Sequence, residues 1–484
     1  MILKKELSIA LNYALNKGFQ IHPNAFKFLE NVDVKKLEKI IKEIVREKTK
    51  QKSYQINQDD LEVYLGIKDD QTLQNDHKIL FDPTLRITTG EGVKGYNALF
   101  SSRFNKLKRI ISDRPESRML KSIASVKTAK TDDDMYVCGL VTSRSVERNI
   151  TKLVLEDPSG LFEGIVFDNE LQKTAGSLLN DQFIMARIGF GKNAGFIIKD
   201  LISPDVPDQT SNRSETETYA VFLSDLHIGS KYFMEEEFTE FVSWLSSPDS
   251  VARKIRFVLI GGDLVDGVGI YPNQDKELVC QTIEEQLKKV EELISKIPSY
   301  IKIFIMPGNH DPGRRALPQP AIPKKYNSGL WERENVFMVG NPAVVSLNGV
   351  KVMMFHGQSI DDIVKTTPGL SYDKPTKVMK HLLRARHLSP IYGSQTPIAP
   401  EMEDLMVIDD IPDIFHVGHV HRAELDMYKG ILLLNSGSWQ KQTPFQASVG
   451  MTPNPGIALM VNLKTFKVYH ENYNSNILNN ILQS

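Results

Sequence analysis

Histidines, aspartates and one asparagine are grouped directly after apolar segments of the sequence. In sheets covered on both faces, ligands bind beyond the carboxyl ends of such buried strands. The groups are Asp225 and His227, then Asp263 and Asp266, then Asn309, His310 and Asp311, then His356, and finally His419 and His421. Two side chains separated by one residue point to the same side of an extended chain. The pattern therefore predicts one polar site assembled from several strand ends.

Metal binding is the chemistry that this set of side chains favours. A single histidine is more often a structural residue than a ligand, but five of the eleven histidines fall in the set. Mixed oxygen and imidazole donors suit Mn²⁺, Fe²⁺ or Zn²⁺, whereas an all-oxygen set would indicate Mg²⁺ or Ca²⁺. We therefore expect a transition-metal site at the strand ends.

A stiff basic loop follows the group at Asn309. Arg314 and Arg315 precede three prolines in the sequence RRALPQPAIP. Guanidinium groups match phosphate oxygens and prolines restrict the backbone, so both arginines are predicted to bind substrate phosphate. The alternative is an ordinary surface loop.

A second basic segment, 373–390, has the same two interpretations. On a helix its cations would form either a stripe along a nucleic-acid backbone or a solvated face. These cations are Lys374, Lys377, Lys380, Arg384 and Arg386.

Residues 219–484 are predicted to form the domain that positions the polar site. Continuous apolar segments at 219–227, 254–267 and 301–311 alternate with amphipathic helical segments, and four further strand-like segments follow from 350 onward. Buried strands separated by helices indicate an α/β fold with a sheet covered on both faces. The strand-rich later part favours a sandwich of two sheets.

The preceding residues divide into four parts. Residues 1–52 have helical periodicity and predict a small helical module, and 53–115 read as a linker with one basic helix. Residues 116–205 contain five short strand patterns whose spacing resembles the OB-fold, a β-barrel used by nucleic-acid-binding proteins; a barrel that serves only domain packing is the alternative. The polar segment 206–218 is predicted to be a second linker.

Composition limits the classes of protein that remain. The chain has 484 residues, enough for about three domains, and a formal net charge of −1, so a polyanion site must be a local patch. Its two cysteines indicate a reducing compartment rather than a disulfide scaffold, and no apolar run is long enough for a membrane helix. We expect a cytoplasmic protein, associated with the nucleoid, that does not bind membranes.

The motifs SDLH, GGDLVDG, PGNHD, FHG and GHVH occur in this order and resemble the calcineurin-like metallophosphoesterases. The resemblance implies that Asp225, His227 and His421 hold one metal ion, and that Asp263 bridges it to a second. The second ion is implied to be held by Asn309, His356 and His419. His310 matches the non-ligand histidine that acts on the leaving oxygen, and Asp266 matches the acid that orients its imidazole.

The stretches GNHDPGRRALPQPAIP, GGDLVDGVGIYPNQ and FHGQSIDD resemble the small subunits of archaeal family D DNA polymerases more specifically. This resemblance implies a helical region, an OB-fold and a phosphoesterase domain in that order. It implies a 3′ to 5′ exonuclease that uses two divalent ions, Mn²⁺ in the first place and Fe²⁺ or Zn²⁺ otherwise. The implied partners are a large polymerase subunit, single-stranded or mismatched DNA 3′ ends and a sliding clamp. An assembly scaffold with little nuclease activity and a stand-alone metallophosphoesterase are the alternatives.

Overall fold

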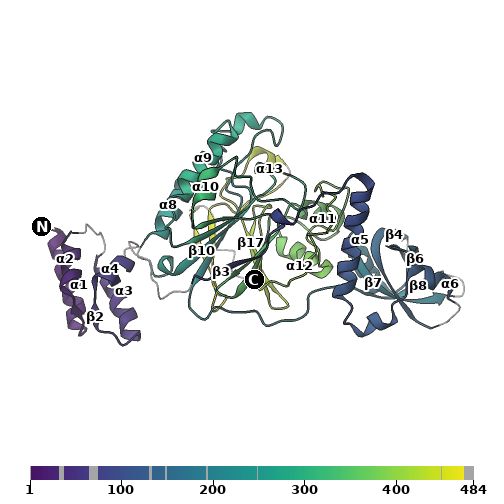
Figure 1. Cartoon of the computed structure of the whole chain (residues 1–484), viewed down its shortest axis with the longest axis horizontal. Helices are drawn as coiled ribbons and strands as arrows, with labels where there is room; N and C mark the ends of the chain where they lie inside the picture. Colours follow the sequence, from purple (N-terminus) through teal and green to yellow (C-terminus); the bar gives the residue numbers. More distant parts are fainter. Residues whose placement is uncertain are drawn as a thin grey trace.

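The described part of the chain forms a helical module, a central two-sheet sandwich and a β-barrel, which follow one another from left to right in Figure 1. The computed structural model describes residues 2–31, 37–64, 75–129, 133–147, 150–191, 195–247, 249–448 and 450–473. Within these ranges no helix has both the length and the apolar character needed to cross a bilayer.

The central sandwich is built from two six-stranded sheets. The first sheet has the order β12-β11-β10-β9-β18-β19, and its strands β9 to β12 are parallel. Its members are β9 (Tyr219–Leu223), β10 (Ile255–Gly261), β11 (Lys302–Met306), β12 (Val336–Met338), β18 (Ile457–Asn462) and β19 (Val468–Asn472). The second sheet has the order β16-β17-β15-β14-β13-β3. Its members are β3 (His77–Phe81), β13 (Ala343–Leu347), β14 (Val350–Phe355), β15 (Ile414–Val417), β16 (Ala423–Tyr428) and β17 (Ile431–Ser436).

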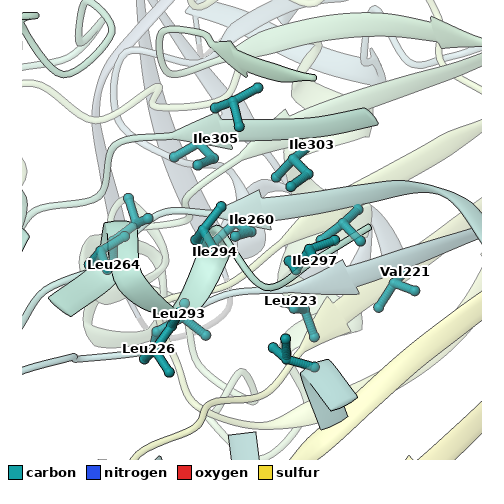
Figure 2. Packing of buried hydrophobic residues seen from close by; sticks show 14 of the residues in the cluster. Val221, Leu223, Leu226, Ile260, Leu264, Leu293, Ile294, Ile297, Ile303 and Ile305 are labelled. Atoms are coloured by element: carbon teal, nitrogen blue, oxygen red, sulfur yellow. The ribbon is translucent and has the colours of Figure 1, made fainter. Parts of the chain in front are cut away.

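Alternate residues of each central strand pack into different layers. Phe222 and Phe257 lie in the core between the two sheets, whereas Val221 and Val258 belong to the core under the helices. Figure 2 shows this outer core, where Leu223, Ile260, Ile303 and Ile305 gather with Leu293, Ile294 and Ile297. Because both faces of the strands are buried, their sequences are continuously apolar.

Helices cover the outer faces of both sheets. The first sheet carries α8 (Glu235–Leu245), α9 (Ile283–Ile294) and α10 (Ser328–Glu332), and the second carries α11 (Ile360–Thr366) and α12 (Pro375–Ala385). Short elements η3 (Ala252–Lys254), η4 (Gln274–Glu277) and α13 (Pro444–Ser448) lie in the connecting loops. The predicted α/β fold, a two-sheet sandwich flanked by helices, is confirmed.

Five strands close into a barrel in the order β4-β5-β6-β8-β7. They are β4 (Met135–Glu147), β5 (Ile150–Asp157), β6 (Gly160–Val166), β7 (Phe183–Gly191) and β8 (Gly195–Ile202), with α7 (Asn169–Ser177) between the third and fourth. Val137, Leu153, Phe162 and Ile184 fill the interior, and α6 (Ile123–Thr128) packs beside β4 and β6.

The helical module extends further than the predicted boundary at residue 52. It contains α1 (Ile2–Asn16), α2 (Pro23–Asn31), α3 (Leu37–Lys50) and α4 (Gln58–Tyr64), with a parallel pair of short strands β1 (Gln20–Ile21) and β2 (Gln55–Ile56). Leu61 and Tyr64 of α4 are buried in its core. The polar residues around these two side chains indicated a linker containing at most a short helix, and α4 is that helix.

The basic helix predicted within 53–115 is present as α5 (Gly92–Ile110), but the residues before it are not the linker that was predicted. Strand β3 pairs antiparallel with β13 and forms an edge of the second sheet, and η1 (Pro83–Leu85), α5 (Gly92–Ile110) and η2 (Pro115–Met119) follow. The exposed side chains of Ile79 and Leu80 show why no alternation was visible, since an edge strand needs little buried surface. Residues 65–74 of that prediction lie outside the described residues.

The predicted linker 206–218 contains no regular helix or strand, but it is bonded to the sandwich along its length. The Asn212 amide N–H donates to Asp413 at 2.8 Å, and the Ser214 amide N–H donates to the carbonyl of Leu463 at 3.0 Å. The connection is therefore held against the surface of the sandwich.

Helix α5 joins the barrel to the sandwich. Its Phe104 ring lies 5.6 Å from the ring of Phe183 in the barrel. On the other side, the buried guanidinium of Arg103 donates from Nε to Asp404 Oδ2 at 2.8 Å. The helix therefore contacts both units.

Candidate functional site

The polar residues predicted to form a site converge beyond the carboxyl ends of strands in both sheets. Asp225 and His227 follow β9, Asp263 and Asp266 follow β10, and Asn309 and His310 follow β11 in the first sheet. His356 follows β14, and His419 and His421 follow β15 in the second sheet. The structure brings all nine residues into one cluster.

One group of donors comprises Asp225, His227 and His421, whose ligand atoms lie within 4.8 Å of one another. The Nε2 atoms of His227 and His421 are 3.0 Å apart, and His421 Nε2 is 3.5 Å from Asp225 Oδ1. This Asp225 oxygen is buried without a hydrogen-bond partner. An unpaired buried carboxylate oxygen facing two imidazoles fits a cation between them.

A second group comprises Asp263, His356 and His419, again within 4.8 Å. His356 Nε2 lies 3.3 Å from Asp263 Oδ2 and 2.9 Å from Asn309 Oδ1. Its other nitrogen, Nδ1, lies 2.9 Å from the carbonyl of Gly261. A carbonyl oxygen only accepts, so Nδ1 carries a proton, and Nε2 is the nitrogen that would lose its proton to bind a metal.

Asp263 lies between the two groups. Besides its place with His356 and His419, it forms a third set with His227 and His310, and its Oδ2 is 3.8 Å from His227 Nε2. A carboxylate has two oxygens that can bind two cations, whereas an imidazole nitrogen offers one lone pair. This position is the one that a bridging ligand requires.

The charges of the site favour an ionised Asp263. Burial alone would raise the pKa of Asp263, but His356, His310 and His227 hold it well below its usual range. Burial lowers the pKa of His356, but Asp263 and Asp225 outweigh that effect and raise it to about 10. The carboxylates thus form a negative centre that attracts cations.

Five of the clustered residues have left-handed backbones. The φ angles are 53° at Asp225, 50° at His227, 52° at Asp263, 70° at His419 and 55° at His421. Each such conformation costs a non-glycine residue on the order of 1–3 kcal/mol and persists where the surroundings enforce it, typically in functional sites. The loops are therefore destabilised by these conformations, which orient the five side chains toward the cluster.

Two glycines allow the loops to approach the donors closely. A Cβ at Gly308 would lie 2.2 Å from Asp263 Oδ1, and one at Gly418 would lie 2.5 Å from Ser224 Oγ and 2.7 Å from Asp225 Oδ2. Any larger residue at either position would displace a carboxylate of the site.

Asp266 has a different arrangement from the predicted one. Its carboxylate lies 3.2 Å from His227 Nδ1 and accepts hydrogen bonds from Gln274 and Gln440. His310 is held by the backbone carbonyl of Asp266, 2.7 Å from its Nδ1. The prediction that the acid itself orients His310 was wrong in this detail, because the ring lies against the main chain. The contact leaves His310 Nε2 free to exchange protons.

Three further residues support the site, of which Asp311 belonged to the predicted polar groups and Asp361 and Gln446 did not. Asp361 Oδ2 lies 3.1 Å from His419 Nε2, and the Gln446 amide lies 2.9 Å from His421 Nδ1. The buried Asp311 carboxylate accepts from the backbone N–H groups of Leu264, Val265 and Gly308, which ties two loops of the site together. Asp311 and Asp361 lie in or beside motifs, which does not reveal their partners, and Gln446 lies 25 positions from His421 without a sequence signal.

The paired arginines differ from each other. Arg314 donates from Nη1 to the buried Glu401 at 2.5 Å and from Nη2 to the carbonyl of Pro318, so it is held within the protein. Arg315 is exposed beside it. Of the two predicted phosphate-binding residues, Arg315 is the more exposed, and the side chain of Arg314 is 25% exposed.

Two of the five cations of the basic segment on α12 form ion pairs within the protein. Lys374 lies 3.2 Å from Glu424, and Lys380 lies 2.5 Å from Asp426, both on β16. These pairs favour the interpretation of a solvated helix face.

The two sheets, their flanking helices and the donor cluster at the strand ends together form an α/β sandwich with a polar site. An archaeal phosphodiesterase of known structure is 12% identical with a TM-score of 0.29, covering 52% of this chain and 99% of that one. The family model that describes the B subunits of DNA polymerases alpha and epsilon matches residues 220–424.

Curated relatives are more similar. The DNA polymerase II small subunit of Archaeoglobus fulgidus is 39% identical over 385 residues, which cover 78% of this chain and 77% of the relative. That of Methanothermobacter thermautotrophicus is 36% identical over 402 residues, covering 81% and 82%. The chain belongs to the family of DNA polymerase II small subunits.

Proposed function

We propose that this chain is the 3′ to 5′ exonuclease subunit of a two-subunit replicative DNA polymerase and that it removes misincorporated nucleotides by hydrolysing DNA phosphodiesters. The observation that carries the proposal is the convergence of carboxylate, amide and imidazole donors around the buried Asp263. A subunit that only held the complex together would have no need of that cluster.

The cluster fits a pair of divalent ions. Asp225, His227 and His421 would hold one ion, Asn309, His356 and His419 would hold the other, and Asp263 would bridge them. Two such ions activate water and neutralise charge on the phosphate when bound. The mixture of nitrogen and oxygen donors favours Mn²⁺, with Fe²⁺ or Zn²⁺ as alternatives.

The protein's own groups position the substrate and move a proton. The carbonyl of Asp266 fixes one proton of His310 on Nδ1, so Nε2 is the atom that takes up a second proton from solvent and, from the imidazolium, gives it to the leaving 3′ oxygen. Asp266 orients His227 through the contact at 3.2 Å. Arg315 is the exposed cation that would bind a phosphate of the DNA strand.

The rest of the chain would connect this site to replication. We propose that the barrel is an OB-fold, that the partner is the large subunit that performs synthesis, and that the complex works in the cytoplasm at the nucleoid. The ligands are DNA 3′ ends, single-stranded or mismatched, with a sliding clamp as a further contact. The domain boundaries at 116, 206 and 219 remain predictions.

A nuclease assay on DNA labelled at its 5′ end tests the proposal directly. The full-length chain, alone and with its large subunit, is incubated with single-stranded and mismatched substrates in Mn²⁺, Fe²⁺, Zn²⁺ or Mg²⁺. We expect stepwise shortening from the 3′ end that is fastest with Mn²⁺. A complex that forms but shortens no substrate with any metal would instead support the scaffold function, and activity without any large-subunit complex would support the stand-alone enzyme.

A further inference from the structure

An exposed aromatic pair lies on two loops that border the donor cluster. The rings of Tyr271 and Phe445 are stacked, with centroids 6.1 Å apart and planes at 18°. Tyr271 is half-buried, whereas Phe445 is 56% exposed although it is a large apolar side chain. We call these two residues the aromatic platform.

Phe445 is attached to the site through the next residue. The buried Gln446 contacts His421 Nδ1 at 2.9 Å, and its Oε1 accepts from the backbone N–H of Thr443 at 3.1 Å. Both ends of the Gln446 amide are therefore used, so α13 is fixed relative to His421. The position of Phe445 is therefore fixed through Gln446, which contacts His421 of the cluster.

Tyr271 is attached in a similar way from the other loop. The buried Gln274 donates to both the carbonyl and the carboxylate of Asp266 at 2.8 Å, and it accepts from the backbone N–H of Ile270 at 2.8 Å. The Tyr271 hydroxyl also donates to Glu277 at 3.1 Å. Two buried glutamines thus hold the platform at a set position beside the site.

We propose that the aromatic platform binds the unpaired terminal base of a DNA 3′ end. This inference rests on the proposed function, because it assumes that the phosphate beside that base lies at the donor cluster. A base offers a flat face to the open side of Phe445, and such stacking tolerates any base identity. A base that is still paired stays stacked within its duplex, so the platform selects frayed and mismatched ends.

The test uses three variants of the full-length protein. Phe445→Ala removes the stacking surface, Phe445→Trp keeps it, and Phe26→Ala makes the same truncation at a 41% exposed phenylalanine of the helical module. Because Phe445 is exposed and Gln446 is unchanged, we expect all three to fold. Binding is measured with EDTA present, which prevents cleavage, on an oligonucleotide with 2-aminopurine as its last base.

We expect the 2-aminopurine fluorescence to change on binding for the parent protein, Phe445→Trp and Phe26→Ala. Phe445→Ala should bind roughly 5- to 100-fold more weakly, as expected for the loss of one stacked base. An oligonucleotide with an abasic last nucleotide should bind the parent and Phe445→Ala equally. With metal added, the preference of Phe445→Ala for mismatched over paired ends should fall by a similar factor.

An unchanged fluorescence response in Phe445→Ala, or none in the parent protein, would overturn the platform. So would a Phe445→Ala variant that binds DNA normally but loses its large subunit, because the surface would then be a protein contact. The two proposals fail separately. A normal fluorescence response without cleavage in any metal would support the platform and reject the exonuclease. Cleavage by the parent protein, with base binding unchanged in Phe445→Ala, would support the exonuclease and reject the platform.

Discussion

Two consecutive aspartates, Asp361 and Asp362, show how differently neighbouring residues of the same type can serve this fold. Asp361 contacts His419 Nε2 at 3.1 Å. Asp362 accepts from the backbone N–H groups of Gln395 and Thr396 at 2.8 and 3.1 Å and so holds a loop. The first supports the donor cluster and the second supports the chain around it.

Asp361→Asn is expected to weaken Mn²⁺ binding by about 10- to 100-fold, because a carboxylate that orients a ligating imidazole also raises its basicity. Isothermal titration of the metal-free protein measures the change. Asp362→Asn is the matched control, which should lower the melting temperature and leave Mn²⁺ affinity nearly normal. Equal affinities in the two variants would argue against a role for Asp361 at the cluster.

His310 and Asp263 provide a second comparison at this scale. His310→Ala should abolish cleavage of DNA while metal content stays near normal, since in the proposed mechanism the imidazole moves a proton and is not a ligand. Asp263→Ala should lose both activity and metal, because the carboxylate between the two donor groups is gone. Metal content by mass spectrometry beside the nuclease assay distinguishes them, and an active His310→Ala would exclude His310 as the acid.

The sequence predicted which residues belong to the site, but it did not predict which residues they contact. His227, Asp263 and the other clustered residues were found because strand ends, glycines and spacing locate side chains at one edge of a sheet. The contact of Asp361 with His419 spans 58 positions, and no local pattern encodes a pairing of that kind. The same reason explains Arg314, whose partner Glu401 occurs far along the chain.

Among the secondary-structure elements, helix α5 carries both a buried and an exposed charged pair. The side chains of Arg103 and Asp404 are each 1% exposed, whereas Arg109, two turns later, is 70% exposed and pairs with Asp409 at 3.1 Å. The first pair lies where α5 meets the sandwich. The second lies on the outer surface.

Arg103→Ala is expected to cost about 3–5 kcal/mol, because Asp404 would remain buried without its partner. Arg109→Ala, on the same helix, should cost less than about 1 kcal/mol. Urea denaturation of both variants measures the difference. Similar costs would mean that α5 is not anchored through Arg103.

A pH dependence follows from the residue beside this pair. His387 Nε2 lies 3.0 Å from Asp404, and its Nδ1 accepts from the backbone N–H of Ser389 at 3.0 Å, so the folded protein holds a neutral imidazole. Burial and then the charge of Arg103 lower the pKa of His387 from 6.5 to about 4. The unfolded chain therefore binds a proton between these values that the folded chain does not.

Stability should fall as the pH drops from about 6.5 to about 4, by about 1.4 kcal/mol per pH unit for this residue. His387→Gln keeps a donor and an acceptor but cannot be protonated, so its stability should change less over the same interval. Urea titrations of both proteins at pH 4.5, 5.5 and 7 supply the comparison. Parallel curves would show that His387 titrates normally.

Strands that are buried on both faces could be predicted from the sequence, whereas the edge strand β3 could not. Segments such as KIFIM of β11 are continuously apolar and marked the first sheet. Strand β3 has only partly buried or exposed side chains, so its place in the second sheet depends on pairing with β13, which lies hundreds of residues away in the sequence.

For the whole molecule, β3 changes where the sandwich begins in the sequence. A protein truncated to 219–473 would lack β3 and α5 and would expose the unpaired edge of β13, which is a template for association with other chains. We expect it to aggregate, whereas 75–473 should remain monomeric and bind Mn²⁺. Size-exclusion chromatography tests this, and a monomeric 219–473 protein would show that β3 is dispensable.

The order of synthesis on the ribosome determines when β3 can pair with β13. Strand β3 leaves the exit tunnel before any residue of the barrel, yet its neighbour β13 is translated only after the whole barrel and most of the first sheet. Strand β3 cannot pair until β13 has been translated, whereas the barrel strands can pair with one another before then. The nascent polypeptide therefore carries an unmatched β-segment for most of its translation, and completing the second sheet is one of the last events in its folding.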